Sequence, residues 1–309
     1  MEQAIVYIGI DVAKAHLDVS GAVQCRRFSN ERSGHVALVR WLKTSQAPMQ
    51  LICEASGGYE QALLESLAEE DLAITLVQAL RVRQYARAAG ILAKTDRIDA
   101  RVLAAFGAAL RPKPAPPLSR QQKRLRELES QRRHLSQVLR AEENRLAQLR
   151  CAELRSLGRS LINKIQKQIR AIEECISSLI AQEQTLCAKG QKLTAVTGVG
   201  ARTAALVLAQ MTELGQLNRR QVAALAGLAP LNHDSGSLRG RRAIFGGRPA
   251  LRSGLYMAAL AAARYNPILS RFYQPLRARG KLHQLALTAV MRKLLLALNH
   301  TLKSLPYTT

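Results

Sequence analysis

The run IVYIGID, at residues 5–11, decides how the first third of this chain folds. Its residues from Ile5 to Ile10 are mostly apolar and β-branched, which predicts a buried strand, and Asp11 stands at the end of that strand. A second apolar run, LIC at residues 51–53, leads in the same way to Glu54. Two strand ends therefore each carry one carboxylate.

Two more carboxylates, Asp96 and Asp99, lie three residues apart in the helix-like stretch KTDRIDARVLAA, where positions i and i+3 share one face. Carboxylates from two strand ends and one helical turn can converge on a hard cation such as Mg²⁺ or Mn²⁺, which prefers oxygen ligands. The sequence therefore predicts a metal site of the kind that cleaves phosphodiesters, formed by Asp11, Glu54, Asp96 and Asp99. The alternative is a set of ordinary turn and helix-cap carboxylates.

Strand-like and helix-like stretches continue to alternate up to about residue 110. Strands are expected at residues 17–23 and 73–78, and helices at residues 34–43, 59–69 and in the segment that carries Asp96. This alternation is typical of an α/β domain with a central mixed sheet, which we expect over residues 1–112. The segment RPKPAPP, at residues 111–117, holds four prolines, cannot continue a helix and predicts an extended linker.

The 309-residue chain carries 46 Lys and Arg against 22 Asp and Glu, a net charge of +24. The excess is concentrated in residues 189–309, which hold 18 basic and 2 acidic side chains. Such a surface attracts a polyanion, because neutralising phosphates releases condensed counterions, and we expect nucleic acid and no membrane. The five cysteines lack metal-ligand spacing, the amino terminus lacks a signal sequence, and no apolar run reaches 18 residues, so we expect a cytoplasmic protein.

Residues 118–188 contain almost no Gly or Pro, and their leucines and isoleucines recur every three or four positions. This spacing predicts two long helices with a break near residues 154–160, where Gly158 lies. An antiparallel hairpin and a dimerising coiled coil both remain open, and a place in a globular bundle explains the spacing nearly as well. With residues 189–309, this segment makes the remainder of the chain all-α.

The stretch LTAVTGVGARTAALVLAQM, at residues 193–211, predicts a helix, a glycine-rich hairpin and a second helix. In helix-hairpin-helix modules, such a hairpin brings backbone N–H groups at a helix start against a phosphate. The sequence therefore predicts nucleic-acid contacts at Gly198 and Gly200.

A polar, glycine-rich loop follows and contains HDSGS at residues 233–237. A serine hydroxyl becomes a nucleophile when a base, a metal or a strong field activates it, and Gly236 allows a backbone that exposes Ser235. Four arginines of this loop are predicted to hold phosphates: Arg239, Arg241, Arg242 and Arg248. Taken alone, these residues favour an ordinary turn in a DNA-contacting loop over a catalytic serine.

Six motifs, in this order and over nearly the whole chain, resemble those of DEDD-type insertion-sequence transposases, the group of bridge-RNA-guided recombinases. They are YIGIDVAKAHLDV (7–19), ICEASGGYE (52–60), AKTDRIDARVLA (93–104), LTAVTGVGARTAA (193–205), AALAGLAP (223–230) and DSGSLRGRRAIFGGRPALR (234–252). The resemblance implies an RNase H/RuvC-like amino-terminal domain, a coiled-coil segment over residues 118–188 and a transposase domain over residues 189–309. It makes Asp11, Glu54, Asp96 and Asp99 the catalytic metal ligands and Ser235 the nucleophile, with Ser237 as second choice.

The resemblance also implies a mechanism. A noncoding bridge RNA pairs with target and donor DNA and so chooses the sequences, while the protein recognises backbone and shape. Ser235 attacks the scissile phosphate with the help of Mg²⁺, and the composite site forms between protomers of a dimer or tetramer. Two other functions remain open: a metal-dependent nuclease or Holliday-junction resolvase that hydrolyses DNA, and a non-enzymatic nucleic-acid-binding protein.

Overall fold

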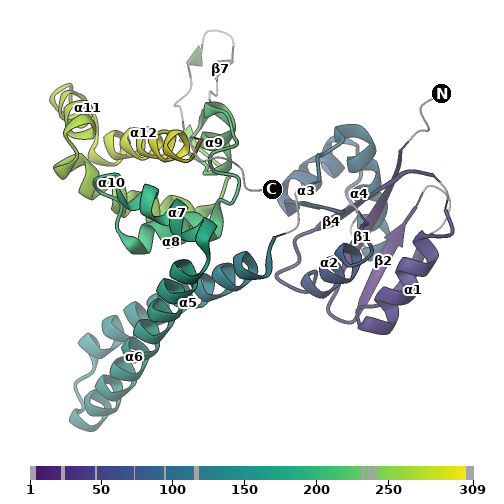
Figure 1. Cartoon of the computed structure of the whole chain (residues 1–309), viewed down its shortest axis with the longest axis horizontal. Coiled ribbons are helices and arrows are strands. Elements are labelled where there is room, and N and C mark those ends of the chain that lie inside the picture. Colours follow the sequence, from purple (N-terminus) through teal and green to yellow (C-terminus); the bar gives the residue numbers. More distant parts are fainter. Residues whose placement is uncertain are drawn as a thin grey trace. The chain divides into compact units, whose positions relative to one another are not determined.

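The computed structural model describes residues 5–21, 25–45, 47–72, 74–93, 95–114, 118–231, 234–235, 238–239 and 243–303; at 231, 234–235 and 238–239 it describes the backbone alone. The chain divides into two compact units, Met1–Pro117 and Leu118–Thr309 (Figure 1). The first unit is mixed α/β and the second consists mainly of helices, which confirms the expected fold class at this level. A further division of the second unit near residue 188 stays a prediction.

A five-stranded mixed sheet in the order β3-β2-β1-β4-β5 forms the centre of the first unit. Its strands are β1 (Val6–Val12), β2 (His16–Ser20), β3 (Cys25–Ser29), β4 (Met49–Glu54) and β5 (Ile74–Val77). β2 runs antiparallel to both β1 and β3, whereas β4 runs parallel to both β1 and β5. The polar edge strand β3 was not predicted, because its sequence CRRFS lacks the apolar alternation of a half-buried strand.

Helices cover both faces of this sheet (Figure 1). α1 (Arg32–Leu42) and α2 (Gln61–Ala68) contribute to one core together with alternate residues of β1, such as Ile8 and Ile10. α3 (Ala79–Ala88) and α4 (Asp96–Leu110) contribute to a second core on the other face. α4 lies very close to the sheet, since a Cβ atom at Gly107 would come within 2.8 Å of Tyr7. The rigid contact between α4 and the sheet fixes the side chains at the start of α4.

The second unit contains eight helices within the described residues. They are α5 (Arg120–Gln148), α6 (Ala152–Gln182), α7 (Gln184–Thr194), α8 (Ala201–Gln210), α9 (Arg219–Leu225), α10 (Pro249–Tyr265), α11 (Pro267–Ala278) and α12 (His283–Lys303). Four two-residue strands lie between α9 and α10: β6 (Pro230–Leu231), β7 (Asp234–Ser235), β8 (Leu238–Arg239) and β9 (Ala243–Ile244). α12 is long and apolar enough to cross a membrane by length and composition, but it packs against α7, α9, α10 and α11 in the core of this unit.

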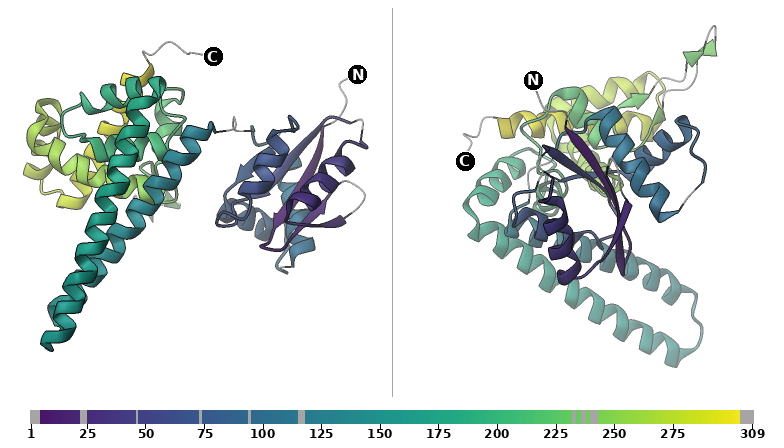
Figure 2. Two further views of the ribbon diagram at one scale, coloured as in Figure 1. Left: turned by 60° about the horizontal axis from the view of Figure 1, so that its bottom comes forward. Right: turned by 90° about the vertical axis from the view of Figure 1, so that its right-hand side faces the viewer.

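α5 and α6 lie side by side as a long two-helix hairpin that extends from the other helices of the second unit (Figure 2). The two long helices are confirmed, but the predicted break at residues 154–160 is wrong. α5 ends at Gln148 and α6 begins at Ala152, so Gly158 lies inside a continuous helix. A Cβ atom at Gly158 would lie 3.0 Å from Leu146, so this glycine serves the close approach of the two helices and does not interrupt one.

Ion pairs join the hairpin to α8. Arg132 donates to both oxygens of the buried Glu129 over 2.8 Å and lies 3.9 Å from Glu173 of α6, which Arg202 of α8 contacts at 2.8 Å. Beyond this network α6 carries three exposed leucines on one side, with exposed fractions of 49%, 68% and 44%: Leu154, Leu157 and Leu161. We call these three residues the leucine stripe.

Candidate active site

Asp11 and Glu54 lie next to each other at the carboxyl ends of two neighbouring parallel strands. β1 and β4 are in register with Ile10 opposite Cys53, so Asp11 and Glu54 are the next residues along each strand. Ile10 and Cys53 point into the core that α1 and α2 cover. Strand alternation therefore directs both carboxylates to the opposite face, where α4 lies.

The first turn of α4 brings two more carboxylates to this face. Asp96 is the first residue of α4, and Asp99 lies in the same turn. The helix touches the sheet at Gly9, where a Cβ atom would lie 2.0 Å from the carbonyl oxygen of Ala100. Because Gly9 precedes Asp11 by two residues and shares its face, the start of α4 stands beside Asp11.

Charge repulsion links these carboxylates. Partial burial and, after it, the negative charges of Asp99, Asp96, Glu54 and Asp18 raise the pKa of Asp11 to about 6. A divalent cation would relieve this repulsion, and a ligand set of carboxylate oxygens suits Mg²⁺ or Mn²⁺. We call Asp11, Glu54, Asp96 and Asp99 the carboxylate cluster; the structure brings all four predicted residues to one face.

Asp18 is a fifth carboxylate beside Asp11, which the sequence pattern did not single out. The β1–β2 ladder sets Asp11 opposite Asp18, and the β2–β3 ladder sets Asp18 opposite Arg27. The side chain of Asp18 is only 5% exposed. Nε and Nη2 of Arg27 donate to its Oδ1 and Oδ2 over 3.1 and 2.7 Å, so Asp18 is buried as one half of a bidentate ion pair.

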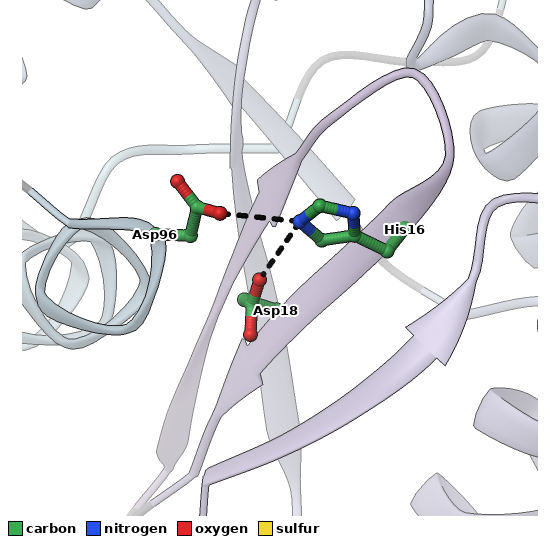
Figure 3. Close-up of side chains that lie close together, drawn as sticks. All are labelled: His16, Asp18 and Asp96. Atoms are coloured by element: carbon green, nitrogen blue, oxygen red, sulfur yellow. Dashed lines mark hydrogen bonds and ion pairs between the residues drawn. The ribbon is translucent and has the colours of Figure 1, made fainter.

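His16 and Arg27 connect Asp18 to Asp96. Nε2 of His16 lies 3.1 Å from Oδ2 of Asp96 and 3.5 Å from Oδ2 of Asp18 (Figure 3). Nη2 of Arg27 lies 3.5 Å from the same oxygen of Asp96. The hydrogen bond with His16, reinforced by the charge of Arg27, lowers the pKa of Asp96, so this carboxylate is ionised near neutral pH.

The loop after Glu54 is closed by Glu60. The backbone N–H groups of Ser56 and Gly58, and the hydroxyl of Ser56, donate to Oε2 of Glu60 over 2.9–3.1 Å. Burial raises the pKa of Glu60, but these hydrogen bonds outweigh burial and lower the pKa overall. Glu60 therefore stays charged and holds the loop that follows Glu54 in place.

Ser235, the predicted nucleophile, lies in the short strand β7. β7 pairs antiparallel with β8, which contains Arg239, and for both strands the backbone is described. Ser237, Arg241 and Arg242 lie outside the described residues. The predicted roles of all five residues therefore stay predictions.

Arg248 follows this loop and forms an ion pair inside the second unit. Its Nη2 and Nη1 donate to the two oxygens of Glu213 over 2.6 and 2.9 Å. Arg126 donates to the carbonyl of Ala209 nearby, and burial, followed by the charge of Arg248, lowers the pKa of Arg126. Arg248 thus anchors the start of α10 to the end of α8, and its predicted contact with phosphate stays a prediction.

The two glycines between α7 and α8 differ in their surroundings. Gly198 has a φ of 101°, and a Cβ atom there would lie 2.5 Å from that of Ala262, so packing against α10 requires a glycine. Gly200 precedes the first residue of α8, and a Cβ atom there would meet nothing within 4 Å. Gly200 is therefore the more open of the two positions predicted to contact nucleic acid.

Two family models match the chain. A transposase model of the DEDD type from IS110 elements matches residues 8–149, and a model described as transposase IS116/IS110/IS902 family matches residues 190–274. The first covers β1, β4 and α4, which carry the carboxylate cluster, and the second covers Ser235 and both glycines.

Similar proteins include the pilin gene-inverting protein of Moraxella lacunata, which is 30% identical over 301 residues, 94% of this chain and 93% of that protein. The pilin gene-inverting protein of Moraxella bovis has the same identity and coverage. An uncharacterized 43.6 kDa protein of insertion element IS110 from Streptomyces coelicolor is 32% identical over 136 residues, 43% of this chain and 33% of that protein. Among solved structures, T. thermophilus RuvC in complex with Holliday junction substrate has 16% identity and a TM-score of 0.29, and covers 36% of this chain and 99% of that chain.

Proposed function

This chain belongs to the IS116/IS110/IS902 family of transposases and is a DNA-processing enzyme, and on that basis we propose that it cuts and rejoins DNA through two sets of residues. The carboxylate cluster holds Mg²⁺ or Mn²⁺, and Ser235 is the nucleophile. We assign the first unit to the RNase H/RuvC-like class of folds. The proposed place of action is the cytoplasm, at the nucleoid.

The convergence of the carboxylate cluster carries this proposal. Asp11 and Glu54 leave two adjacent parallel strands on one face, and the first turn of α4 adds Asp96 and Asp99 on that face. A fold gains no stability from such crowding, as the raised pKa of Asp11 indicates. Crowded acids that do not stabilise the fold are expected where a cation binds.

Each part of the cluster has a proposed task. A bound divalent cation supplies Lewis acidity toward the scissile phosphate and neutralises its charge. Asp11 and Glu54 stand on rigid strand ends, and Asp96 and Asp99 stand on the first turn of α4. The ligand atoms therefore keep their spacing when the substrate binds. The Gly200 turn and the loop arginines contact the nucleic-acid backbone.

The proposed covalent step involves Ser235. Its hydroxyl oxygen forms a bond to the scissile phosphorus and loses its proton to a base, and the DNA oxygen on the other side of the phosphorus departs as the leaving group. One phosphate ester replaces another, so the reverse attack by a DNA hydroxyl rejoins a strand without ATP. The Asp-Ser-Gly sequence and the arginines around it support this role.

Rejoining is favoured over hydrolysis by the names of two relatives. Both full-length Moraxella relatives are called pilin gene-inverting proteins, and an inversion requires that cut strands be joined again. A nuclease or resolvase that uses water shares the carboxylate cluster but leaves the arginine-rich serine loop without a task. We therefore rank hydrolysis as the second candidate.

We further propose a noncoding bridge RNA and a homo-oligomer as partners. The positive charge of residues 189–309 supports binding of backbones from both RNA and DNA. The exposed leucine stripe on α6 supports contact between the hairpins of two protomers, since an apolar stripe of this kind is the seam of a coiled coil. In a dimer or tetramer, the carboxylates of one protomer and the serine of another form the composite site.

The test is a cleavage reaction on end-labelled DNA with Mg²⁺ and the RNA of the element, resolved on a denaturing protein gel. Wild-type protein should give a labelled protein band, Ser235→Ala should lose it, and Ser237→Ala, the matched control, should keep it. Asp11→Asn should abolish cleavage. Cut DNA without a covalent band would establish hydrolysis and leave Ser235 as a turn residue.

A further inference from the structure

We propose that His16 and Arg27 are positioning residues that hold Asp96 for metal binding, and that Asp18 orients Arg27. His16 and Arg27 contact one oxygen of the Asp96 carboxylate and leave the other for the cation. This inference rests on the proposed function, because it assumes that Asp96 is a metal ligand. It concerns three side chains outside the carboxylate cluster, from β2 and β3.

Asp18 is engaged by Arg27 and is not assigned to a metal ion. One ligand atom each from His16, Asp18 and Asp96 lies within 4.8 Å of the others, a spacing that a metal ion could use. Both oxygens of Asp18, however, already accept hydrogen bonds from Arg27, over 3.1 and 2.7 Å. The whole residue Asp18 is only 3% exposed, so a cation has little access to it. We therefore assign to Asp18 the role of orienting Arg27.

His16 and Arg27 contact Asp96 on one side of its carboxylate. Nε2 of His16 at 3.1 Å and Nη2 of Arg27 at 3.5 Å both approach its Oδ2. For each of these two side chains, the contact given with Asp96 is at Oδ2. We assign Oδ1 to the cation, which is the arrangement that outer partners impose on ligating carboxylates.

Asp96 is more exposed than a rigid metal ligand would be, so its side chain needs contacts that hold it. The side chain of Asp96 is 52% exposed and lies at the start of a helix, whereas Asp11 comes from inside a strand. The other acids of the cluster repel Asp96 toward solvent, and an exposed side chain loses rotamer freedom when it is fixed. His16 and Arg27 supply the contacts that offset both effects before the cation arrives.

The row across the sheet explains why these residues act together. Asp11, Asp18 and Arg27 stand opposite one another on β1, β2 and β3, so one line of side chains runs from the metal site to the sheet edge. Arg27 pairs with the buried carboxylate of Asp18, which serves the fold, and its Nη2 also lies 3.5 Å from Oδ2 of Asp96, which extends the same ion pair to the carboxylate cluster.

The experiment is a titration of the full-length protein with Mn²⁺ by calorimetry, together with the Mg²⁺ concentration for half-maximal cleavage. Arg27→Gln should raise both the dissociation constant for Mn²⁺ and the Mg²⁺ concentration for half-maximal cleavage by about 10–100-fold, the loss of affinity expected for outer partners of a metal ligand. His16→Ala should raise these two values less. Arg27→Lys keeps the positive charge but loses the bidentate guanidinium, so its values should fall between those of wild type and Arg27→Gln. Arg26→Gln is the matched control, because Arg26 is exposed on the same strand and alternates to the other face.

A double variant separates positioning from folding. Arg27→Gln leaves Asp18 buried without its partner, so this protein is expected to melt at a lower temperature. Asp18→Asn/Arg27→Gln removes both charges and should recover the melting temperature while metal binding stays weak. Recovery of both properties would overturn the proposal and assign Arg27 to the fold alone.

Two further outcomes also overturn it. Metal binding by Arg27→Gln equal to that of Arg26→Gln would show that Asp96 needs no grip, and tighter binding would show that Arg27 competes with the cation. Asp11→Asn tells which proposal has failed. If Asp11→Asn leaves Mn²⁺ binding unchanged, the metal site itself is misassigned; if it abolishes binding while Arg27→Gln has no effect, only the positioning role is lost.

Discussion

The two units treat a partly buried carboxylate in opposite ways. In the second unit, burial raises the pKa of Glu213, but the two hydrogen bonds from Arg248 outweigh burial and lower the pKa overall. In the first unit, Asp11 has acids for neighbours, and its pKa is raised to about 6. Pairing with Arg248 favours the ionised form of Glu213, whereas the acids around Asp11 disfavour its ionised form, and a bound cation would relieve that repulsion.

The same contrast holds between two neighbours in one sheet ladder. Asp18 stands directly opposite Asp11 in the ladder, yet Arg27 pairs with it as Arg248 pairs with Glu213. Two acids that face each other in one ladder therefore differ in their surroundings, since Asp18 has a bidentate basic partner whereas acids crowd Asp11. Four experiments test how far this comparison extends.

The largest effect is expected for Asp11→Asn. Metal-assisted cleavage should fall by about 10³-fold, because a Lewis-acid cation contributes several kcal/mol to the transition state. Thermal unfolding without metal should stay the same or shift upward, since the substitution removes repulsion. A drop in melting temperature by several degrees would break the comparison, because Asp11 would then be a structural acid like Glu213.

The next effect concerns the backbone on which each site is built. Gly9→Ala places a Cβ atom 2.0 Å from the carbonyl of Ala100 and should cost about 3 kcal/mol of unfolding free energy, since overpacking moves α4 from the sheet. Gly200→Ala in the second unit meets open space and should change stability by less than about 0.5 kcal/mol. Chemical denaturation measures both. Equal losses of unfolding free energy would show that Gly9 and Gly200 tolerate an added methyl group equally well.

Glu213→Gln should be the reverse of Asp11→Asn. It should lower the unfolding free energy by about 1–3 kcal/mol, the range for hydrogen bonds between charged groups, because Arg248 loses its carboxylate partner. Cleavage under conditions where the protein stays folded should remain within a few-fold of wild type. Loss of cleavage with normal stability would instead make Glu213 functional.

The smallest effect is a pH dependence. The pKa of Asp11 is raised from 3.8 to about 6, so the folded protein holds this proton more tightly than the unfolded chain. Its contribution to stability is complete below about pH 4 and is lost as the pH rises through 6, by about 1 kcal/mol, because solvent screens the charges around this half-buried group. Melting curves of metal-free wild type minus Asp11→Asn should show this fall, and saturating Mg²⁺ should reduce it. A difference that does not change with pH would contradict the crowding of Asp11.

Much of the first unit could be predicted from sequence because its signals are local. β1 and β4 are apolar runs, and the helical spacing around Asp96 marks α4, so all four carboxylates were predicted as a group and lie on one face. His16, Asp18 and Arg27 were not predicted to belong to the site. The ladder register that sets Arg27 opposite Asp18 has no local signature in the sequence.

The second unit was harder to predict for a different physical reason. A glycine in a helical stretch reads as a break, yet Gly158 lies within α6 because the neighbouring helix needs the space. The ion pair of Arg248 with Glu213 was not predicted either, because the two residues lie 35 positions apart, and the predicted contact of Arg248 with phosphate stays a prediction. Tertiary contacts set the surroundings of Gly158 and Arg248, and sequence spacing does not contain those contacts.

The length of the α5–α6 hairpin can be compared with the length of a DNA duplex. Arg132 and Arg202 join the base of the hairpin to α8 through Glu173, and the stretch of α5 from Arg132 to Gln148 spans about 25 Å at 1.5 Å per residue. Duplex DNA advances about 3.4 Å per base pair, so this arm is as long as roughly seven base pairs. In the proposed oligomer, a protomer that contacts the leucine stripe would therefore lie most of one duplex turn away from the base of the hairpin.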